Sequence, residues 1–303
     1  MHEVRVPGPF ESYSNNPILT HRNNGFSEIQ GIGHADIVED INRNWWMVFL
    51  GFRTACGMYH HLGRETFLAP VEWNEDGWPV VNGNGTVSLA MESNKITIKQ
   101  ILIDTFEDNF DDNTLDCQWN FVGNPYKDMY SLIERKGYLR IYGSEITLND
   151  IGSPSFVGKR QQHFNCSVET LLDFKPEKIN EEAGFTVIMD EKHHYEIAVV
   201  GDSQNRKIIV RRTIGKLSGI VAAEVIENGS VKLEISADIG EYHFKYAIGE
   251  NQFKEIADGE TRYLSSEVAG GFIGVYFGLY ATGNGIRNNA PADFEYFKYK
   301  AIE

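Results

Sequence analysis

The sequence predicts an all-β protein in two parts. Apolar residues recur with period two in short runs, which is typical of half-buried strands. Clusters of Gly, Asn, Asp and Pro separate these runs and indicate tight turns. Near residue 100 an aromatic-rich part gives way to regularly alternating strands. The predicted domains are therefore residues 1–100 and residues 101–303.

The sequence pattern of residues 1–100 is typical of tightly layered β-structure with buried aromatic strands. The run NWWMVFLGFR (44–53) is apolar on both faces, and VEWNEDGWPVV (71–81) predicts a hairpin whose turn is NEDG. Four of the five tryptophans lie in this part. Propeller blades use aromatic strands in this way, and the length allows about two blades. The segment 87–104, which has no internal glycine or proline, is the predicted crossover to the second part.

Residues 101–303 predict a sandwich of two antiparallel sheets. Apolar and polar residues alternate in HFNCSVETLLDF (163–174), SVKLEISAD (230–238) and EYHFKYAIG (241–249). Each run has one face suited to a core and one suited to water, as in antiparallel sheets. Strands of this kind continue to the end of the chain, so the sandwich is predicted to span roughly 200 residues.

Composition excludes several classes of partner. The formal net charge of −15 repels a phosphate backbone, and no Lys/Arg cluster suits nucleic acid or an anionic membrane. No apolar run has membrane-spanning length, and the first residues lack the apolar core of a secretory signal, which leaves bacterial cytoplasm and periplasm both open. The odd set Cys56, Cys117 and Cys166 predicts core thiols rather than disulfides or a zinc site.

Several motifs in order carry a family resemblance. GPFESYSNNPILTHRN (8–23), GHADIVED (33–40) and HHLGRETFLAPVEWNEDGWPVVN (60–82) resemble the end of the catalytic five-bladed β-propeller of glycoside hydrolase family 43, in its β-xylosidase and arabinofuranosidase-like members. The stretch from DTFEDNFDDNTLDCQWNF (104–121) to PADFEYFKYK (291–300) resembles that family's concanavalin A-like sandwich, a jelly roll. The resemblance implies C-terminal blades of a propeller followed by this sandwich.

His34 lies in a predicted glycine-flanked turn. The resemblance implies that its imidazole projects into the propeller channel, where it holds a calcium ion or an ordered water near the catalytic carboxylates. The alternative is a turn histidine that bonds only to backbone. Asp36 and Glu39 follow on the same strand, but residues three apart on a strand point to opposite faces, so they are not a predicted catalytic pair. No cofactor is expected to be required.

Arg64, in LGRET, is the second candidate. The matching family arginine binds the sugar in the first subsite, where a planar guanidinium can bridge a hydroxyl and a carboxylate. The alternative is a surface ion pair with Glu65 or Glu72, which would contribute little. In the family a loop of the sandwich also brings an aromatic side chain to the pocket mouth, and GGFIGVYFGLY (270–280) offers Phe272 or Tyr276. The alternative is that every ring in this stretch is core.

The remaining clusters indicate structural roles. His60 with His61, and His193 with His194, are adjacent pairs whose side chains face opposite ways on a strand, so a shared metal is not predicted. Turn carboxylates of the sandwich could hold a structural calcium ion or cap backbone amides. These carboxylates are Asp111, Asp112, Asp116 and Asp293.

The residues that hydrolyse a glycosidic bond are not among these candidates. Hydrolysis needs two carboxyl groups across the bond. In the family the base is an aspartate, a second aspartate tunes the acid, and the acid is a glutamate in a short Glu-Gly-Pro-like segment. All three precede the stretch with which this chain begins, and no Glu-Gly-Pro occurs in the 303 residues. The expectation is a C-terminal portion of an inverting hydrolase that is inactive alone and acts on xylo-oligosaccharides or arabinofuranosyl-xylan. Its expected partners are an N-terminal propeller portion or further copies of itself. A non-catalytic carbohydrate-binding module and a structural oligomerisation domain are the alternatives.

Overall fold

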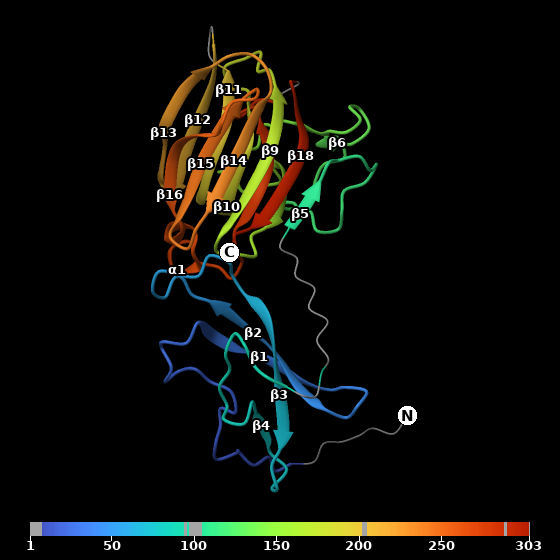
Figure 1. Cartoon of the computed structure of the whole chain (residues 1–303), viewed down its shortest axis with the longest axis vertical. Coiled ribbons are helices and arrows are strands. Elements are labelled where there is room, and N and C mark those ends of the chain that lie inside the picture. The colour runs from blue at the N-terminus through green and yellow to red at the C-terminus, as the bar shows by residue number, and fades with distance from the viewer. Residues whose placement is uncertain (1–7, 94–95, 97–104, 202–204, 288–289, 303) are drawn as a thin grey trace. The chain divides into compact units, whose positions relative to one another are not determined.

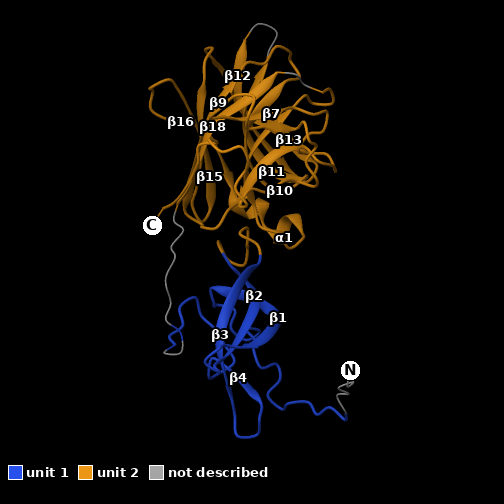
Figure 2. Cartoon of the chain, turned by 90° about the vertical axis from the view of Figure 1, so that its right-hand side faces the viewer, with its two compact units in different colours: residues 1–54, 64–99 blue, residues 55–63, 100–303 orange. Residues whose placement is uncertain are grey.

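The computed structural model describes residues 8–93, 96, 105–201, 205–287 and 290–302 (Figure 1). The chain divides into two compact units, coloured separately in Figure 2. Unit 1 is residues 1–54 and 64–99, and unit 2 is residues 55–63 and 100–303. The sequence does not anticipate that residues 55–63 join the second unit. Most of the predicted crossover at 87–104 lies outside the described residues.

Unit 1 is built on one antiparallel meander. Its strands are β1 (Ile29–Glu39), β2 (Trp45–Arg53), β3 (Glu65–Trp73) and β4 (Pro79–Val81), hydrogen-bonded in that order. Within the described part of residues 1–100 this is a single four-stranded sheet, where the length had allowed about two blades. Its own small core packs against one face and includes Ile29, Phe49 and Val71.

The predicted hairpin at 71–81 is present as β3 and β4. Trp73 pairs with Pro79, and the Asn74 amide donates to the Trp78 carbonyl at 2.9 Å. Gly77 has φ 78°, a left-handed value that glycine adopts without strain, and its amide donates to the Asn74 carbonyl at 3.0 Å. The turn chemistry of NEDG therefore closes the hairpin locally.

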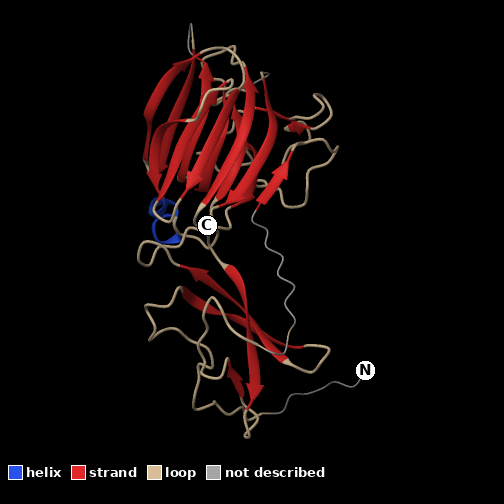
Figure 3. Ribbon diagram, viewed as in Figure 1, coloured by secondary structure: helices blue, strands red, loops and turns tan. Residues whose placement is uncertain are grey.

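Unit 2 is a sandwich of a six-stranded and an eight-stranded sheet (Figure 3). The six-stranded sheet has the order β13, β12, β11, β10, β17, β8. The other has the order β16, β15, β14, β9, β18, β7, β6, with β5 also paired to β18. The strand bounds are β5 Thr105–Asp108, β6 Tyr130–Ser131, β7 Leu139–Tyr142, β8 Ser155–Arg160, β9 Cys166–Phe174, β10 Glu182–Asp190, β11 His193–Gly201, β12 Arg206–Ile214, β13 Leu217–Ile226, β14 Val231–Ala237, β15 Glu241–Ile248, β16 Lys254–Glu260, β17 Tyr276–Thr282 and β18 Pro291–Ala301.

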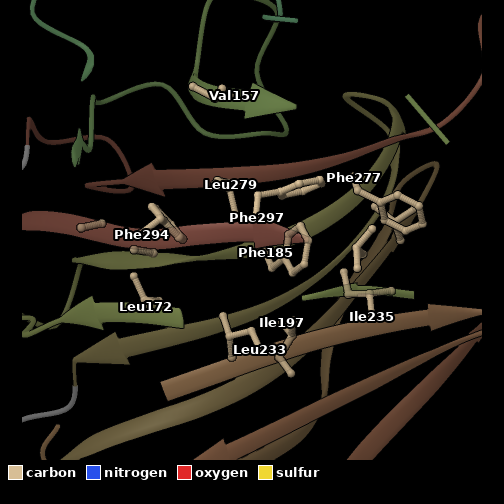
Figure 4. Packing of buried hydrophobic residues seen from close by; sticks show 14 of the residues in the cluster. Val157, Leu172, Phe185, Ile197, Leu233, Ile235, Phe277, Leu279, Phe294 and Phe297 are labelled. Carbon is tan, nitrogen blue, oxygen red and sulfur yellow. The ribbon is translucent and has the colours of Figure 1, made fainter. Parts of the chain in front are cut away.

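The core of the sandwich lies between the two sheets (Figure 4). Alternate residues of β9 and β14 face it, as period two predicts, including Val168, Leu172 and Leu233, which are fully buried. Phe277 on β17 and Phe297 on β18 enter the same core from opposite sheets. The predicted alternation at 163–174, 230–238 and 241–249 is confirmed in β9, β14 and β15.

A second apolar cluster covers the opposite face of the six-stranded sheet. It includes Phe156, Ile188 and Tyr280. The Phe156 ring lies over two glycines: a Cβ atom built on Gly278 would be 1.9 Å from this ring, and one built on Gly158 would be 2.3 Å from it. The glycines of this sheet therefore make room for an aromatic ring, as close strand packing requires.

Among the described residues, helical structure is confined to one short region of unit 2. A 3₁₀ turn, Thr261–Leu264, precedes α1, Ser266–Ala269. Of the helices in the described ranges, none has the length and apolar character needed to cross a bilayer.

Two residue-level expectations are wrong. Cys166 is buried, but Cys56 and Cys117 are exposed, because neither follows the alternation of a half-buried strand. All three cysteines are free thiols.

Candidate functional site

His34 lies in a strand and not in a turn, which corrects the sequence prediction. It belongs to β1, whose pairing with β2 shifts register between Gln30 and Gly33 and again between Gly33 and Asp36. His34 has φ 50°, a value uncommon outside glycine, and Gly31 has φ 58°. A Cβ on Gly31 would be 2.0 Å from the Phe52 ring, so this ring requires glycine there. The irregularity removes His34 from the regular in-and-out alternation and leaves it exposed.

Arg64 is exposed and immediately precedes β3. Its neighbour Glu65, one of the two alternative ion-pair partners, is held by Arg53: the Arg53 Nε donates to Glu65 Oε2 at 2.9 Å and its Nη2 to Oε1 at 2.8 Å. This two-point geometry is the strong form of an arginine–carboxylate pair. Glu65 therefore already has an arginine partner on β2.

The register brings His34 and Arg64 into one sheet. Gly33 pairs with Leu50, Leu50 pairs with Thr66, and Gly51 pairs with Glu65. His34, on β1, and Arg64, immediately before β3, therefore lie near the same level of β2. Strands β1 and β3 are two strand spacings apart, about 10 Å, which is within the span of a bound sugar and its contacts.

The described residues do not form a metal site at His34. Among them there is no group of three or more His, Cys, Asp or Glu side chains that could hold an ion. His34 would supply a single imidazole donor, and Asp36 and Glu39 are exposed on the same irregular strand. Metal sites in proteins need several donors at fixed geometry, and the described residues around His34 do not supply such a set.

The segment 55–63 connects β2 to β3 and packs on the sandwich as part of unit 2. Glu267 accepts hydrogen bonds from the His60 amide at 2.9 Å and from the His60 ring at 2.6 Å. The Val275 amide donates to the His61 carbonyl at 2.9 Å, and Arg160 Nη2 donates to the Leu62 carbonyl at 2.6 Å. A Cβ on Gly274 would be 2.0 Å from the same Leu62 carbonyl oxygen. The glycine-rich stretch before β17 is thus fitted to this segment.

Phe272 and Tyr276 differ in their surroundings within unit 2. Phe272 is 69% exposed, although it lies only two residues before Gly274. Tyr276 begins β17 and packs partly buried against the outer-face cluster of Phe156, Ile188 and Tyr280. It also lines a cavity of about 420 Å³ in unit 2. Neither ring belongs to the core between the sheets, which Val275 and Phe277 occupy instead.

The paired histidines of the sandwich have separate partners. His193 lies 2.9 Å from Asp190, and His194 lies 2.8 Å from Glu196. His61 is fully buried, with its ring edge-on to Phe164 and Tyr242. Each of these histidine rings therefore has its own neighbours.

Two arginines bind Asp293, whereas the sequence predicts a calcium ligand or a cap of backbone amides at this position. Arg140 Nε donates to one carboxylate oxygen at 2.7 Å, and Arg135 Nη1 donates to the other at 2.8 Å. Burial by itself raises the pKa of Asp293, but these hydrogen bonds outweigh it and hold the pKa below its ordinary value. Arg135 lies in the loop between β6 and β7.

Sequence reasoning missed a buried charged cluster on the six-stranded sheet. Arg211 donates to Glu182 at 2.8 and 2.9 Å and to Glu196 at 2.5 Å, and Tyr280 Oη donates to Glu182 at 2.7 Å. Burial opposes ionisation of Glu196, yet the His194 and Arg211 contacts hold its pKa below the ordinary value. Both carboxylates are at most 3% exposed and fully engaged. The cluster is therefore structural. The sequence does not predict it, because its members come together only through the pairing of β10, β11, β12 and β17.

Two family models match the chain. Residues 2–79 match glycosyl hydrolases family 43. Residues 107–300 match the β-xylosidase C-terminal concanavalin A-like domain.

Similar curated proteins extend well beyond this chain. A non-reducing end α-L-arabinofuranosidase of Bacteroides ovatus is 38% identical over 297 residues, which are 98% of this chain and 56% of the relative. A xylosidase/arabinosidase of Butyrivibrio fibrisolvens is 34% identical and covers 97% of this chain and 57% of its own length. The chain thus spans little more than half the length of these relatives.

Solved structures agree in fold. A Bacteroides ovatus structure described as xyloglucan PUL GH43B has a TM-score of 0.93 at 38% identity, covering 97% of this chain and 58% of its own. A xylan β-1,4-xylosidase from Bacillus halodurans has a TM-score of 0.90 at 28% identity, covering 98% and 58%. With propeller strands and a concanavalin A-like sandwich both matched in sequence and in fold, this chain belongs to glycoside hydrolase family 43.

Proposed function

We propose that this chain is the C-terminal portion of an inverting glycoside hydrolase that acts on xylo-oligosaccharides or on arabinofuranosyl-xylan. The names of the relatives support both substrate classes, since they include arabinofuranosidases and xylosidases. The observation that carries the proposal is the exposed Arg64 of the LGRET motif, immediately before β3, in the part of the chain that matches glycosyl hydrolases family 43. A guanidinium there can direct its planar set of donors at sugar hydroxyls.

The candidate residues have separate roles in this proposal. Arg64 binds the hydroxyls of the terminal sugar, and this contact strengthens as charge develops in the transition state. His34, held exposed by the irregular strand, orients an ordered water or a sugar hydroxyl through one ring nitrogen. The exposed Phe272 ring is the better of the two aromatic candidates, because Tyr276 packs on the sandwich itself.

Catalysis in this proposal needs an acid and a base that the 303 residues do not supply. An inverting hydrolase places its two carboxyl groups about 6.5–9.5 Å apart, with room for a water between them. Two buried carboxylates of the described residues, Glu182 and Glu196, are bound to one arginine and are at most 3% exposed, so they are not open to a sugar. We expect the isolated chain to hydrolyse aryl xylosides and aryl arabinofuranosides no faster than background.

The test is a chimaera in which this chain follows the N-terminal propeller portion of the Bacteroides ovatus relative. We expect Arg64→Ala to lower kcat/KM for the better of an aryl xyloside and an aryl arabinofuranoside by about 100-fold, and Arg64→Lys to recover only part of the loss. The matched control is Arg22→Ala, an exposed arginine of the same unit. Equal kinetics for the two alanine variants would remove Arg64 from the site, and turnover by the isolated chain that is lost in Arg64→Ala would contradict the need for a second part.

A further inference from the structure

Unit 2 contains a large groove whose lining includes Tyr130 and Ser131 of β6. Strand β6, labelled in Figure 1, is at one edge of the eight-stranded sheet. The volume of the groove is about 1030 Å³, at the upper end of the range of small-molecule sites. The loop between β5 and β6 forms one wall, and Tyr142 of β7 and Arg287 contribute from other parts of the fold. We call it the Tyr126 groove, after the residue that is central to its chemistry.

Aromatic rings line this groove. They are Trp119, Phe121, Tyr126, Tyr130 and Tyr142, and the rings of Phe121 and Tyr130 are stacked with centroids 5.6 Å apart. Tyr126 is 56% exposed, and among the described residues its ring stacks on no other ring. An exposed tyrosine offers a flat apolar face together with a polar tip. Such a face suits a ligand that is flat, partly apolar and rich in hydroxyl groups.

Hydrogen-bonding groups stand beside the rings. Glu134, which is 47% exposed, accepts from Tyr142 Oη at 2.5 Å and from Arg140 at 3.5 Å, so its carboxylate is oriented from one side. Arg287 and Asp128 form an ion pair on the opposite part of the lining, and both are more than 60% exposed. Carboxylates accept from hydroxyls and a guanidinium donates to them, so both kinds of partner for a sugar hydroxyl are present.

The wall of the groove is held in place before any ligand binds. Trp119 Nε1 donates to Asp108 Oδ2 at 2.7 Å, and the Asn120 and Gly158 backbones exchange hydrogen bonds at 2.8 and 2.9 Å. Met129, next to Tyr130, is buried in the sandwich core. A preformed wall lowers the ordering cost of binding.

Charge narrows the class of ligand. Asp116, Asp128 and Glu134 outnumber Lys127 and Arg287 in the lining, and the chain has a net charge of −15. A polyanion is therefore disfavoured, and a fully apolar ligand would leave these charged groups desolvated and unpaired. A neutral polyhydroxylated ring compound satisfies both constraints.

We propose that the Tyr126 groove binds a neutral oligosaccharide of pyranose rings, with one ring stacked on Tyr126 and its hydroxyls bonded to Glu134 and to the Asp128–Arg287 pair. This site lies within the sandwich and contains no residue of the proposed catalytic portion. It makes the sandwich a carbohydrate-binding unit in its own right, independent of whether the chain takes part in hydrolysis.

The test is calorimetric titration of the full chain with xylotetraose and, in a second arm, with cellotetraose. We expect at least one sugar to bind, with about a tenfold or greater loss of affinity in Tyr126→Ala, near-complete retention in Tyr126→Phe and a several-fold loss in Glu134→Gln. Phe26→Ala, which removes a fully exposed ring from unit 1, is the matched control and should bind normally. Thermal melting of each variant shows whether the fold is intact.

Three results would overturn the proposal. They are no binding of either sugar, unchanged affinity in both Tyr126→Ala and Glu134→Gln, and a loss of affinity in Arg64→Ala with the groove variants unaffected. The last result would assign the sugar to unit 1. Failure of the groove would leave the chimaera kinetics of Arg64 untouched, so the two proposals are tested separately.

Discussion

Asp293 shows how a single buried charge is made compatible with a sheet. Its side chain is 5% exposed, yet it is ionised because two arginines from β7 and the loop before it bond to its two oxygens. Removing the carboxylate would take from Arg140 its two-point partner and would leave it with Glu134 at 3.5 Å, while Arg135 would keep Asp173 alone at 2.7 Å. Loss of one partner from a buried ion pair is among the most destabilising changes available to a protein.

We therefore expect Asp293→Ala to lower the free energy of unfolding by about 3 kcal/mol, measured by urea denaturation at pH 7. The control is Asp258→Ala, which removes the acid of an exposed pair with Arg212 and should cost about 0–1 kcal/mol. A similar loss in both variants would mean that the burial of Asp293 does not matter.

The same group predicts part of the acid sensitivity. The pKa of Asp293 is depressed in the folded state, so its contribution is fully present above the unfolded pKa of about 3.9 and is lost as the pH falls below it. Stability of the wild-type chain should therefore fall more steeply between about pH 4 and pH 2 than that of Asp293→Asn. Parallel stability profiles for the two proteins would contradict this assignment.

At the scale of elements, strand β17 makes room for the Phe156 ring through its one glycine, Gly278. Gly278 sits between β10 and β8, with pairs on both sides, so its backbone has no room to move away from the Phe156 ring. Adding one methyl group must displace that ring from the outer-face cluster. Overpacking of this kind lowers the free energy of unfolding by about as much as many cavity-forming substitutions do.

We expect Gly278→Ala to destabilise the sandwich by about 1–3 kcal/mol in urea denaturation. Gly219→Ala is the matched control, because Gly219 is also in a strand but has open space around its Cβ position, and it should change stability by at most about 0.5 kcal/mol. Phe156→Ala combined with Gly278→Ala should cost less than the sum of the two changes, since both act on one ring. Strict additivity would argue against the clash.

Elements also show where sequence reasoning works. Strands β9, β14 and β15 follow from period two alone, because each has one face in the core and one in water. The irregularity at His34 does not follow from local pattern, since it depends on Phe52 packing against Gly31 across the strand pair. Likewise, nothing in residues 55–63 indicates that their hydrogen-bond partners lie at Arg160, Glu267 and Val275.

The candidate site divides in the same way. The resemblance in sequence selects Arg64 and His34 as residues, while the Arg53–Glu65 pair that weakens one alternative for Arg64 appears only once the strands are paired. The choice between Phe272 and Tyr276 also depends on how exposed each ring is. The sequence of this aromatic stretch does not predict that exposure. The Tyr126 groove has no sequence motif, because its lining comes from a long loop, one strand and Arg287.

At the scale of the whole molecule, the three thiols differ in their access to solvent. Cys56 and Cys117 are exposed, whereas Cys166 is fully buried in the sandwich core and burial raises its pKa to about 12. We expect two thiols to react with Ellman's reagent within seconds at pH 8, and the third to react only as the sandwich opens. Rapid reaction of all three thiols without denaturant would mean that the core around Cys166 is open to solvent.

The discontinuous make-up of unit 2 has a consequence for synthesis on the ribosome. Residues 55–63 emerge roughly 200 residues before Glu267, Gly274 and Val275, which at about 5–20 residues per second is a delay of about 10–40 s. During that interval the His60 amide and the His61 carbonyl do not yet have the partners that they have in the folded unit, while the meander of unit 1 can already form. Completion of the sandwich therefore waits for Val275, and a nascent chain released before Glu267 would leave His60 and His61 without the backbone partners that they have in the folded unit.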